Sequence, residues 1–521
     1  SASPLELELM YYVKIQEPQG VNKVICTKDD SCLLFNCFRL DAFGALTTFM
    51  GCSAGIEEFT CDNREFYPEM LNLTGKQGVP EEPCGVIKTS VFIEAGKSLQ
   101  ITFSLGQTFE DGLRDELLSR AVIPNKILAE LNSVQNYWSG IFDCIQVATP
   151  DEAFNIMVNS RLLYQVLSCR MEGRTAFYQS GGAFGFRDQL QDSLALLFCR
   201  PDLVREQILL HCSRQFEEGD VQHWWHPPMG SGIRSRCSDD YLWLPYAVYE
   251  YVYFTGDKSV LEECVPFLKS PVLSAGEQER YETPEVSPEK ASVYEHCVRA
   301  VRLAMGRMGS HGLPLIGSCD WNDGMNYVGK EGRGESIWLG WFLCHVLERM
   351  SFLTELMGES GQDYRKAAET ISSNIESSAW EQDHYIRAFY DDGTPMNIVD
   401  SISQSWSVIS GFGDKERSKS ALKIADARLV DKENGIVKLL DPPFDIESDS
   451  ENPGYIAMYP PGVRENGAQY THGALWLAKA FIMIGNPDRG YELLSMINPV
   501  NHTVTMADAM KYKTEPYAVA A

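Results

Sequence analysis

The sequence of 521 residues has no Lys/Arg-rich run, no apolar run near the length of a membrane span, and no Cys-x-x-Cys pair. Binding to a phosphate backbone needs basic patches, so the missing basic run and the formal net charge of -27 argue against nucleic acid as a partner. A membrane-spanning helix needs about 20 apolar residues, and Ser1–Met10 is not a signal peptide, so no membrane partner is expected.

The cysteines also lack the spacing of a disulfide framework. There are 15 of them, an odd number, scattered from Cys26 to Cys344. Several lie in apolar helical runs, such as Leu196–Cys199. Buried free thiols of this kind are typical of a reducing compartment, and we expect a cytoplasmic protein.

Two halves of different character follow one another along the chain. Up to about residue 112 the apolar runs are short and strand-like. From about Asp111 onward, apolar residues recur at three-to-four spacing, which predicts helices separated by long loops. The expected strands are 10–15, 24–26, 32–38 and two strands within 91–105 around an Ala-Gly-Lys turn; the expected helices are 159–171, 241–253, 336–357 and 470–484.

Residues 317–326, Gly-Ser-Cys-Asp-Trp-Asn-Asp-Gly-Met-Asn, carry the densest group of reactive side chains. Trp321 offers a flat face on which a sugar ring can stack, and Asn322 can hydrogen-bond a hydroxyl group. Asp320 and Asp323 are both candidate proton donors for a glycosidic oxygen. The structural alternative is an Asp/Asn/Gly-rich loop whose side chains cap the next helix.

Four further loops are rich in aromatic, Arg and carboxylate side chains, a combination that favours a sugar site shared with an anion. In each of them a helix cap or a surface role is the alternative interpretation. His223 and His226 stand at i, i+3, but the prolines that follow would break a helix, so we expect an aromatic wall and no metal site. The loops are 178–192 with Arg187, Asp188 and Asp192; 223–228; 232–245 with Arg236 and Asp239; and 459–472 with Arg464, Glu465 and His472.

Five ordered blocks resemble the inverting β-glycoside phosphorylases of glycoside hydrolase family 94, which include cellobiose and chitobiose phosphorylases and a domain of cyclic β-1,2-glucan synthases. The likeness runs from about Trp138 to the end, and a loop of sequence Ser-Ala-Gly-Glu-Gln-Glu-Arg-Tyr is most similar to the glucan-synthase branch. The blocks are Gly-Phe-Arg-Asp-Gln-Leu-Gln-Asp (185–192), Arg-Ser-Arg-Cys-Ser-Asp-Asp-Tyr-Leu-Trp-Leu-Pro (234–245), Asp-Trp-Asn-Asp-Gly-Met-Asn (320–326), Gly-Arg-Gly-Glu-Ser-Ile-Trp-Leu-Gly (332–340) and Tyr-Pro-Pro-Gly-Val-Arg-Glu-Asn-Gly (459–467).

The resemblance implies an α+β protein in three parts. We expect a β-sandwich over 1–112, a helical linker over 113–148, and an (α/α)6-barrel catalytic domain over 149–521. The sandwich is short for the family. Family members also continue beyond the point matching the end of this chain, so we expect a fragment that lacks the end of the barrel and a Thr-Gly pair that helps bind phosphate.

The resemblance also implies roles for individual residues. Asp323 matches the general acid, and His472 matches a phosphate-binding histidine. Arg187 matches an arginine facing the sugar or the phosphate. Around them, the expected substrate-binding residues are Arg187, Asp192, Arg236, Asp239, Trp321, Asn322 and Glu465. No cofactor is expected, since inorganic phosphate is the co-substrate, and we expect a homodimer.

The expected activity is phosphorolysis of β-linked gluco-oligosaccharides, either β-1,2-glucan or cellobiose-type substrates, to an α-sugar-1-phosphate. An inverting hydrolase would need a second carboxylate to activate water, whereas phosphate is already a nucleophile, so one acid and a cationic pocket suffice. Two alternatives remain open on the sequence alone: an inverting glycoside hydrolase on the same fold, and a non-catalytic glycan-binding fragment.

Overall fold

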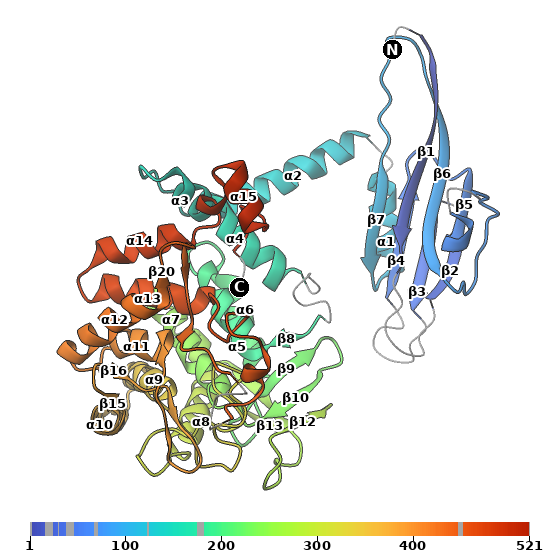
Figure 1. The fold of residues 1–521 in the computed structure, drawn as a ribbon. Helices are drawn as coiled ribbons and strands as arrows, with labels where there is room; N and C mark the ends of the chain where they lie inside the picture. Colours follow the sequence, from blue (N-terminus) through green and yellow to red (C-terminus); the bar gives the residue numbers. More distant parts are fainter. Residues whose placement is uncertain are drawn as a thin grey trace. The chain divides into compact units, whose positions relative to one another are not determined.

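The computed structural model describes residues 3–15, 24–29, 31–37, 46–66, 71–121, 124–173, 182–445 and 452–519. Residues 178–181 of the first expected loop, and residue 38 of one expected strand, lie outside these ranges. The chain forms two compact units, Ser1–Gly140 and Ile141–Ala521 (Figure 1). Across the described ranges, no helix combines the length and the apolar character that crossing a membrane requires.

The first unit is built from two antiparallel sheets. One has the strand order β1-β6-β5 and the other the order β2-β3-β4-β7 (Figure 1). The strands are β1 (Leu5–Lys14), β2 (Val24–Asp29), β3 (Cys32–Cys37), β4 (Thr47–Cys52), β5 (Glu58–Asp62), β6 (Pro83–Ile93) and β7 (Phe103–Thr108). Two helices follow, α1 (Asp111–Ala121) and α2 (Pro124–Phe142), the second of which ends at the start of the second unit.

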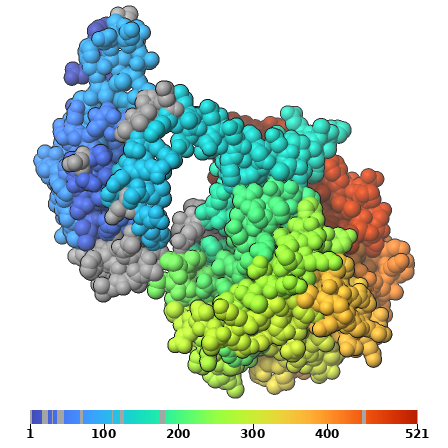
Figure 2. All heavy atoms as spheres, turned by 180° about the vertical axis from the view of Figure 1, so that it is seen from behind, coloured from blue at the N-terminus to red at the C-terminus, as the bar shows by residue number. Residues whose placement is uncertain are grey.

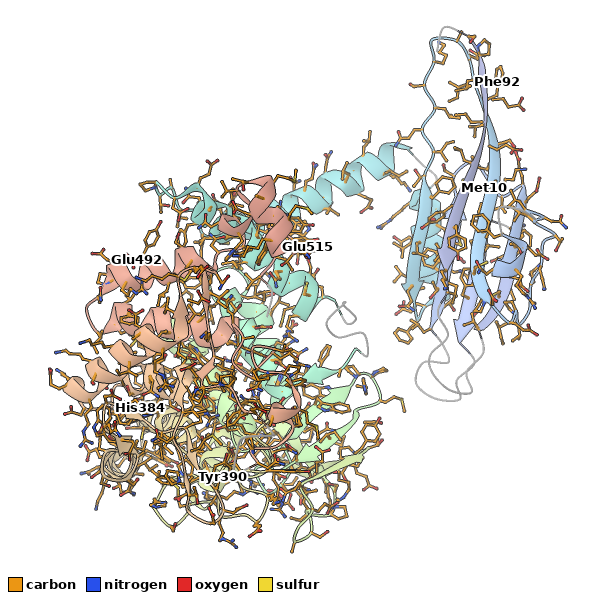
Figure 3. The ribbon with its side chains drawn as sticks, viewed as in Figure 1. Met10, Phe92, His384, Tyr390, Glu492 and Glu515 are labelled. Carbon is orange, nitrogen blue, oxygen red and sulfur yellow. The ribbon has the colours of Figure 1, made fainter. Side chains whose placement is uncertain are left out.

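Both sheets contribute side chains to one apolar core. Phe35 and Met50 come from the second sheet, while Cys61 and Ile87 come from the first, and all four are nearly inaccessible to solvent. The period of two along a strand leaves the opposite faces outside, where Met10 and Phe92 are exposed (Figure 3).

The prediction of two strands around an Ala-Gly-Lys turn is confirmed for the turn and wrong for the strand bounds. Gly96 adopts a positive φ of 72°, and the Lys97 N–H donates to the Glu94 carbonyl. However, β6 ends at Ile93 and β7 begins only at Phe103, and each pairs with different strands. The long β6 is held by β1 along its whole length, so its partner is not the next strand in sequence.

The second unit is mainly helical. Residues 152–171 form one continuous helical stretch in which α3 (Glu152–Ile156) and α4 (Leu162–Val166) alternate with π-helical turns. The other helices are α5 (Phe186–Ser193), α6 (Pro201–Cys212), α7 (Trp243–Thr255), α8 (Val293–Met305), α9 (Ile337–Leu356), α10 (Gln362–Ser378), α11 (Ser401–Ile409), α12 (Lys415–Leu429), α13 (Thr471–Met483), α14 (Pro487–Ile497) and α15 (Met506–Tyr512).

These helices alternate between an inner and an outer set. In chain order α5, α7, α9, α11 and α13 contact one another, and α6, α8, α10, α12 and α14 each contact the inner helix that precedes them (Figure 1). Figure 2 shows all heavy atoms of this unit from behind, in the same colours along the chain. The inner helix α9 is buried on all sides, since every residue from Ile337 to Leu347 is buried. Outer helices such as α10 carry one apolar face, with Ala368, Ile371 and Ile375 buried.

Short strands lie in the loops between the helices. The largest sheet has four antiparallel strands in the order β12-β10-β9-β8, next to α5. The strands are β8 (Phe184–Gly185), β9 (Gln222–His226), β10 (Ser231–Ser235), β11 (Cys264–Lys269), β12 (Glu279–Glu282), β13 (Glu285–Ser292), β14 (Glu335–Ser336), β15 (Trp380–Glu381), β16 (His384–Tyr385), β17 (Ala388–Phe389), β18 (Pro395–Met396), β19 (Val399–Asp400), β20 (Val430–Asp431), β21 (Ile436–Val437) and β22 (Leu440–Asp441).

Candidate active site

A cavity of about 290 Å³ lies where β8, β9, the loop 320–326 and the first turns of α5 and α13 meet. Four of the five sequence blocks that resemble the phosphorylases contribute lining residues. The block 332–340 contributes none. Its lining comprises Ala183, Gly185, Arg187, Asp188, Gln191, His223, Trp224, His226, Asp240, Trp321, Asp323, Glu465, Tyr470 and His472. A larger cavity of about 990 Å³ lies among α14, α15 and residues 432–436, none of which the sequence analysis singled out.

The loop 320–326 is anchored by a buried ion pair. Asp320 has no solvent exposure, and its two carboxylate oxygens each accept a hydrogen bond of 2.7 Å from Arg387. The Ser336 hydroxyl donates to the same carboxylate over 2.6 Å. Burial would raise the pKa of Asp320, but Arg387 outweighs it and the pKa is lowered. Asp320 is therefore a structural carboxylate, which leaves Asp323 as the candidate proton donor of this loop.

Asp323 faces the cavity. Its side chain is 43% exposed, and its Oδ1 atom lies 3.1 Å from the Arg187 guanidinium. The following residue, Gly324, is packed so closely that a Cβ atom there would lie 2.7 Å from Ile456. The Ile456 N–H donates to the Gly324 carbonyl over 2.9 Å. The backbone beside Asp323 is thus fixed, while its carboxylate remains accessible to a ligand.

Arg187, in the first turn of α5, is the cation at the centre of the site. It donates through Nη1 to the Trp321 carbonyl over 2.8 Å, and its Nη2 is shared between Asp239 and Asp323. Burial would lower the pKa of Arg187, but Asp239 and Asp323 outweigh it, so the pKa lies well above its usual value. Arg187 joins three segments of the chain and stays charged.

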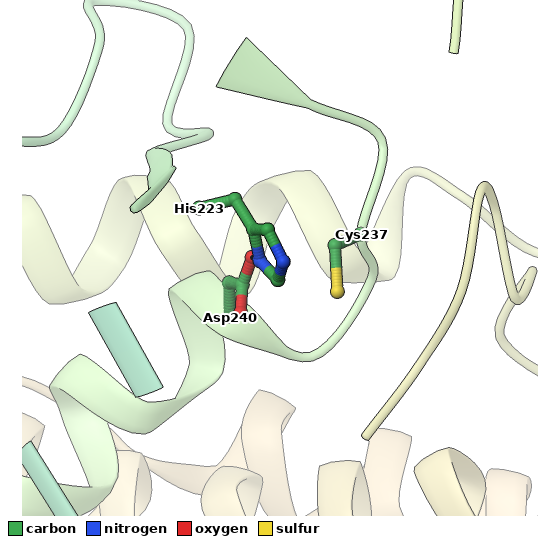
Figure 4. Close-up of side chains that lie close together, drawn as sticks. All are labelled: His223, Cys237 and Asp240. Carbon is green, nitrogen blue, oxygen red and sulfur yellow. Dashed lines mark hydrogen bonds and ion pairs between the residues drawn. The ribbon is translucent and has the colours of Figure 1, made fainter. Parts of the chain in front are cut away.

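His223 also belongs to the site. The sequence did not indicate its proximity to Asp323. Its Nδ1 lies 2.7 Å from an Asp240 oxygen, and its Nε2 lies 4.0 Å from Asp323 Oδ2. Burial would lower the pKa of His223, but Asp240 outweighs it and raises the pKa well above its usual value. Figure 4 shows the ring between Asp240 and Cys237. The His-Trp-Trp-His motif is on strand β9, where the sequence had indicated only an aromatic wall.

Trp321 is held by an aromatic cluster under the cavity. Its ring lies edge-on to His472 and is tilted against Trp476, with centroids 5.8 and 5.5 Å away. Trp476 in turn contacts Trp338 of α9 and Trp406 of α11. Three inner helices therefore set the position of Trp321.

His472 lies in the first turn of α13 and stacks on Trp476 with an interplanar angle of 23°. Burial lowers the pKa of His472 to about 4, with Asp188 as the main opposing charge. The imidazole is neutral at neutral pH, so it carries one ring N–H that can donate to a ligand.

The structure brings only some of the expected substrate residues to the cavity. Arg187, Trp321, Asp323, Glu465 and His472 line it. The others do not line it. Asp192 pairs with Arg170 over 2.5 Å, and Arg236 donates to the Leu273, Ser274 and Glu277 carbonyls. Asp239 is fully buried, pairs with Arg187 and accepts from Trp243 Nε1 over 2.9 Å, and Asn322 is 1% exposed and accepts from the Gly324 N–H over 3.1 Å.

Because His211 is buried, we expect the fold to lose stability in mild acid. Burial lowers the pKa of fully buried His211 to about 4, against about 6.5 in an unfolded chain. Between these values only the unfolded chain takes up the proton, so His211 stabilises the fold above pH 6.5 and this contribution is lost as the pH falls toward 4. We expect His211 alone to account for about 3 kcal/mol across this range.

Denaturant unfolding at several pH values, compared between the wild type and His211→Phe, measures this contribution. The difference between the two pH profiles should be confined to the range from about 6.5 to 4. Parallel profiles throughout this range would show that folding does not lower the pKa of His211.

A model of the family described as "Glycosyl hydrolase 94 superfamily, catalytic domain" matches residues 137–521. The cyclic beta-(1,2)-glucan synthase NdvB of Rhizobium meliloti is 43% identical over 497 residues, which cover 91% of this chain and 17% of that protein. The solabiose phosphorylase of Paenibacillus borealis is 28% identical, over 80% of this chain and 52% of that protein. The N,N'-diacetylchitobiose phosphorylase of Vibrio proteolyticus is 26% identical, over 84% of this chain and 55% of that protein.

The chain therefore spans about a sixth of the glucan synthase and about half of each of these two phosphorylases. Among solved structures, a bacterial glucoamylase complexed with acarbose superposes with a TM-score of 0.55. That similarity covers 95% of this chain and 71% of the glucoamylase at 12% identity, so it concerns the fold alone.

Proposed function

The chain belongs to the glycosyl hydrolase 94 superfamily, and on this premise we propose that it catalyses inverting phosphorolysis of β-linked gluco-oligosaccharides. The observation that carries the proposal is the accessible Asp323 carboxylate between two cations, Arg187 and His223, at the wall of one cavity. Such a site supplies one acid and a pocket for an anion, which is what phosphate as the nucleophile requires.

In the proposed reaction Asp323 donates its proton to the glycosidic oxygen as the bond from that oxygen to C1 breaks. Phosphate attacks C1 from the opposite face, so a β-glycoside gives an α-sugar-1-phosphate and a shortened sugar with a free hydroxyl. Trp321, fixed by the aromatic cluster, offers the platform for the sugar ring that is transferred. Asp323 regains a proton from solvent before the next turnover.

Arg187 couples the two halves of this reaction. Its Nη2 is paired with Asp323 in the described structure, so a phosphate that binds Arg187 competes with the acid for the same donor. Phosphate binding would weaken the Arg187–Asp323 pair and so make protonation of Asp323 easier. His472, which lines the same cavity, supplies a second, neutral donor.

We expect His472→Phe to raise the apparent KM for phosphate by about 10–100-fold and to change the KM for the sugar less. Phenylalanine keeps the stacking on Trp476 and removes the N–H, and a hydrogen bond to a charged group contributes about 1.5–3 kcal/mol. His472→Gln, which keeps a donor, should lie closer to the wild type. Steady-state kinetics with each substrate varied in turn tests this, and equal increases in both KM values would indicate a scaffolding role.

The finer architecture is also a proposal. The five inner-and-outer helix pairs within 186–497 support an (α/α)6 barrel, and the two sheets of the first unit support a β-sandwich. The division into 1–112, 113–148 and 149–521 follows the change from strands to α1 and α2 and then to the packed helices. The active-site cavity lies within the second unit alone.

For the substrate we propose β-1,2-linked glucose oligomers. The support is the 43% identity to a protein named as a cyclic beta-(1,2)-glucan synthase, against 28% or less for the phosphorylases compared. Linkage specificity depends on where acceptor hydroxyls meet buried polar groups, and one unmatched group can cost a factor of about 10⁴. In the synthetic direction, from α-glucose-1-phosphate, we expect the β-1,2 dimer to be extended fastest. Extension of only the β-1,4 dimer or of N-acetylglucosamine acceptors would contradict this.

An inverting hydrolase is the second candidate, because Asp188 and Glu465 also line the cavity and a carboxylate across from the acid could activate water. Incubation with β-linked gluco-oligosaccharides, with and without phosphate, separates the candidates. Sugar-1-phosphate formed only with phosphate supports the phosphorylase. Free reducing sugar at the same rate in both arms supports the hydrolase, and binding without turnover supports a glycan-binding fragment.

A further inference from the structure

Two buried cysteines lie near each other beside Asp323, although neither lines the active-site cavity. Cys237 follows β10 and Cys319 precedes the loop that carries Asp323, and both are buried. The backbone holds their segments together, since the Ser238 N–H donates to the Cys319 carbonyl over 2.9 Å and the Ser318 N–H donates to the Arg236 carbonyl over 3.2 Å. The two sulfur atoms and an Asp323 oxygen all lie within 4.8 Å of one another.

His223 extends this group on its other side. A ring nitrogen of His223, the Cys237 sulfur and an Asp240 oxygen also lie within 4.8 Å of one another (Figure 4). Because Nδ1 is engaged by Asp240 over 2.7 Å, Nε2 is the nitrogen directed toward Asp323, 4.0 Å away. A histidine that donates Nδ1–H to a carboxylate and offers Nε2 has the arrangement found at metal-binding histidines.

We propose that His223, Cys237, Cys319 and Asp323 form a site for a thiophilic divalent cation of the Zn²⁺ or Cd²⁺ type, with Asp240 orienting His223. The donor set of one nitrogen, two sulfurs and one oxygen is of the kind that binds such ions tetrahedrally. In a tetrahedral zinc site neighbouring ligand atoms stand about 3.3–3.8 Å apart. The donor atoms of each of the two groups lie within 4.8 Å of one another, and the groups share the Cys237 sulfur, so binding needs a contraction of about 1–1.5 Å in each group and an approach of His223 to the Cys319 sulfur.

The charges around the group favour a dication. Asp239, Asp240 and Asp323 contribute three carboxylates, against the cations Arg187 and His223. On binding, each thiol and the His223 ring release a proton to solvent, and the Arg187 Nη2 atom, 3.4 Å from the Cys237 sulfur, remains beside the new thiolate. The ion would occupy Asp323, the proposed acid, so its binding would inhibit the enzyme.

The test is a titration of the reduced, chelator-treated chain with Cd²⁺, followed by the ultraviolet absorption of thiolate-to-Cd²⁺ charge transfer. This signal needs no activity and is therefore independent of the proposed reaction. We expect one ion per chain, displaced by Zn²⁺, and at least about 100-fold weaker binding in Cys319→Ser. Cys264→Ser, which changes an exposed cysteine outside the site, should bind Cd²⁺ as the wild type does.

Cys237→Ser should weaken binding as strongly as Cys319→Ser. Far-ultraviolet circular dichroism establishes that each variant is folded, and Cys319→Ser decides the question if Cys237→Ser does not fold. A Cd²⁺ signal that persists unchanged in folded Cys319→Ser would overturn the proposal, as would the absence of any charge-transfer band in the wild type.

Discussion

Asp323→Asn is expected to lower the turnover number by about 10²–10⁴-fold on an ordinary β-glycoside while leaving the fold intact. The amide has the shape of the carboxylic acid but cannot give a proton to the leaving oxygen. The folding cost should be small, because the Asp323 side chain is 43% exposed and one ion pair to Arg187 is lost. Steady-state turnover and thermal unfolding, measured on the same preparation, separate the two effects.

A matched set of variants makes this result specific. A glycoside with a good leaving group needs little protonation, so it should recover part of the lost rate in Asp323→Asn. Asp188→Asn changes another carboxylate of the same cavity and should lose less, because phosphate replaces the base that a hydrolase would need. Near-wild-type turnover of Asp323→Asn would remove Asp323 from the acid role, and an equal loss in Asp188→Asn would favour the hydrolase.

Arg387→Met should destabilise the second unit by about 3–5 kcal/mol, because it leaves two buried carboxylates without their partner. Arg387 has no solvent exposure and lies between Asp320 and Asp400, at 2.7 and 2.9 Å. Asp400 also caps α11, and Asp320 anchors the loop of Trp321 and Asp323. Unfolding in urea, followed by tryptophan fluorescence, measures the loss.

Lys419→Met provides the control for this variant. It also removes one positive charge paired with one carboxylate, but the Lys419–Glu416 pair is exposed at 55% and 81%. Exposed pairs contribute little, so no clear change in the urea midpoint is expected. If Arg387→Met were as stable as Lys419→Met, the buried pair would not be what holds the catalytic loop.

Three inner helices of the second unit, α7, α9 and α13, could be predicted closely from the sequence, because they are strongly apolar. The expected helix 336–357 is α9, Ile337–Leu356, and the expected helix 470–484 is α13, Thr471–Met483. Strand pairing could not be predicted to the same degree. β6 pairs with β1, which lies about 80 residues earlier in the chain. No turn motif next to β6 indicates this long-range pairing.

Within the site, short motifs identified several residues that line the cavity. The sequence did not indicate roles that depend on contacts with distant segments. The motif alone left Asp320 and Asp323 as candidate acids, and the family resemblance favoured Asp323; the structural reason that Asp320 is engaged lies in Arg387, 67 residues further on, which binds both of its oxygens. His223 was assigned to an aromatic wall, since its contacts with Asp240 and Asp323 come from other segments. Such contacts have no signal in a single sequence.

The anomeric configuration of the first product tests the central claim most directly. Phosphorus and proton nuclear magnetic resonance spectra, recorded from the start of a reaction of β-linked gluco-oligosaccharides with inorganic phosphate, distinguish an α-sugar-1-phosphate from its β form and from free sugar. A single acid with phosphate on the opposite face predicts that the α-sugar-1-phosphate is the first product. Asp323→Asn should form it far more slowly than the wild type. Initial accumulation of free sugar without any sugar-1-phosphate, or of the β-phosphate, would contradict the account.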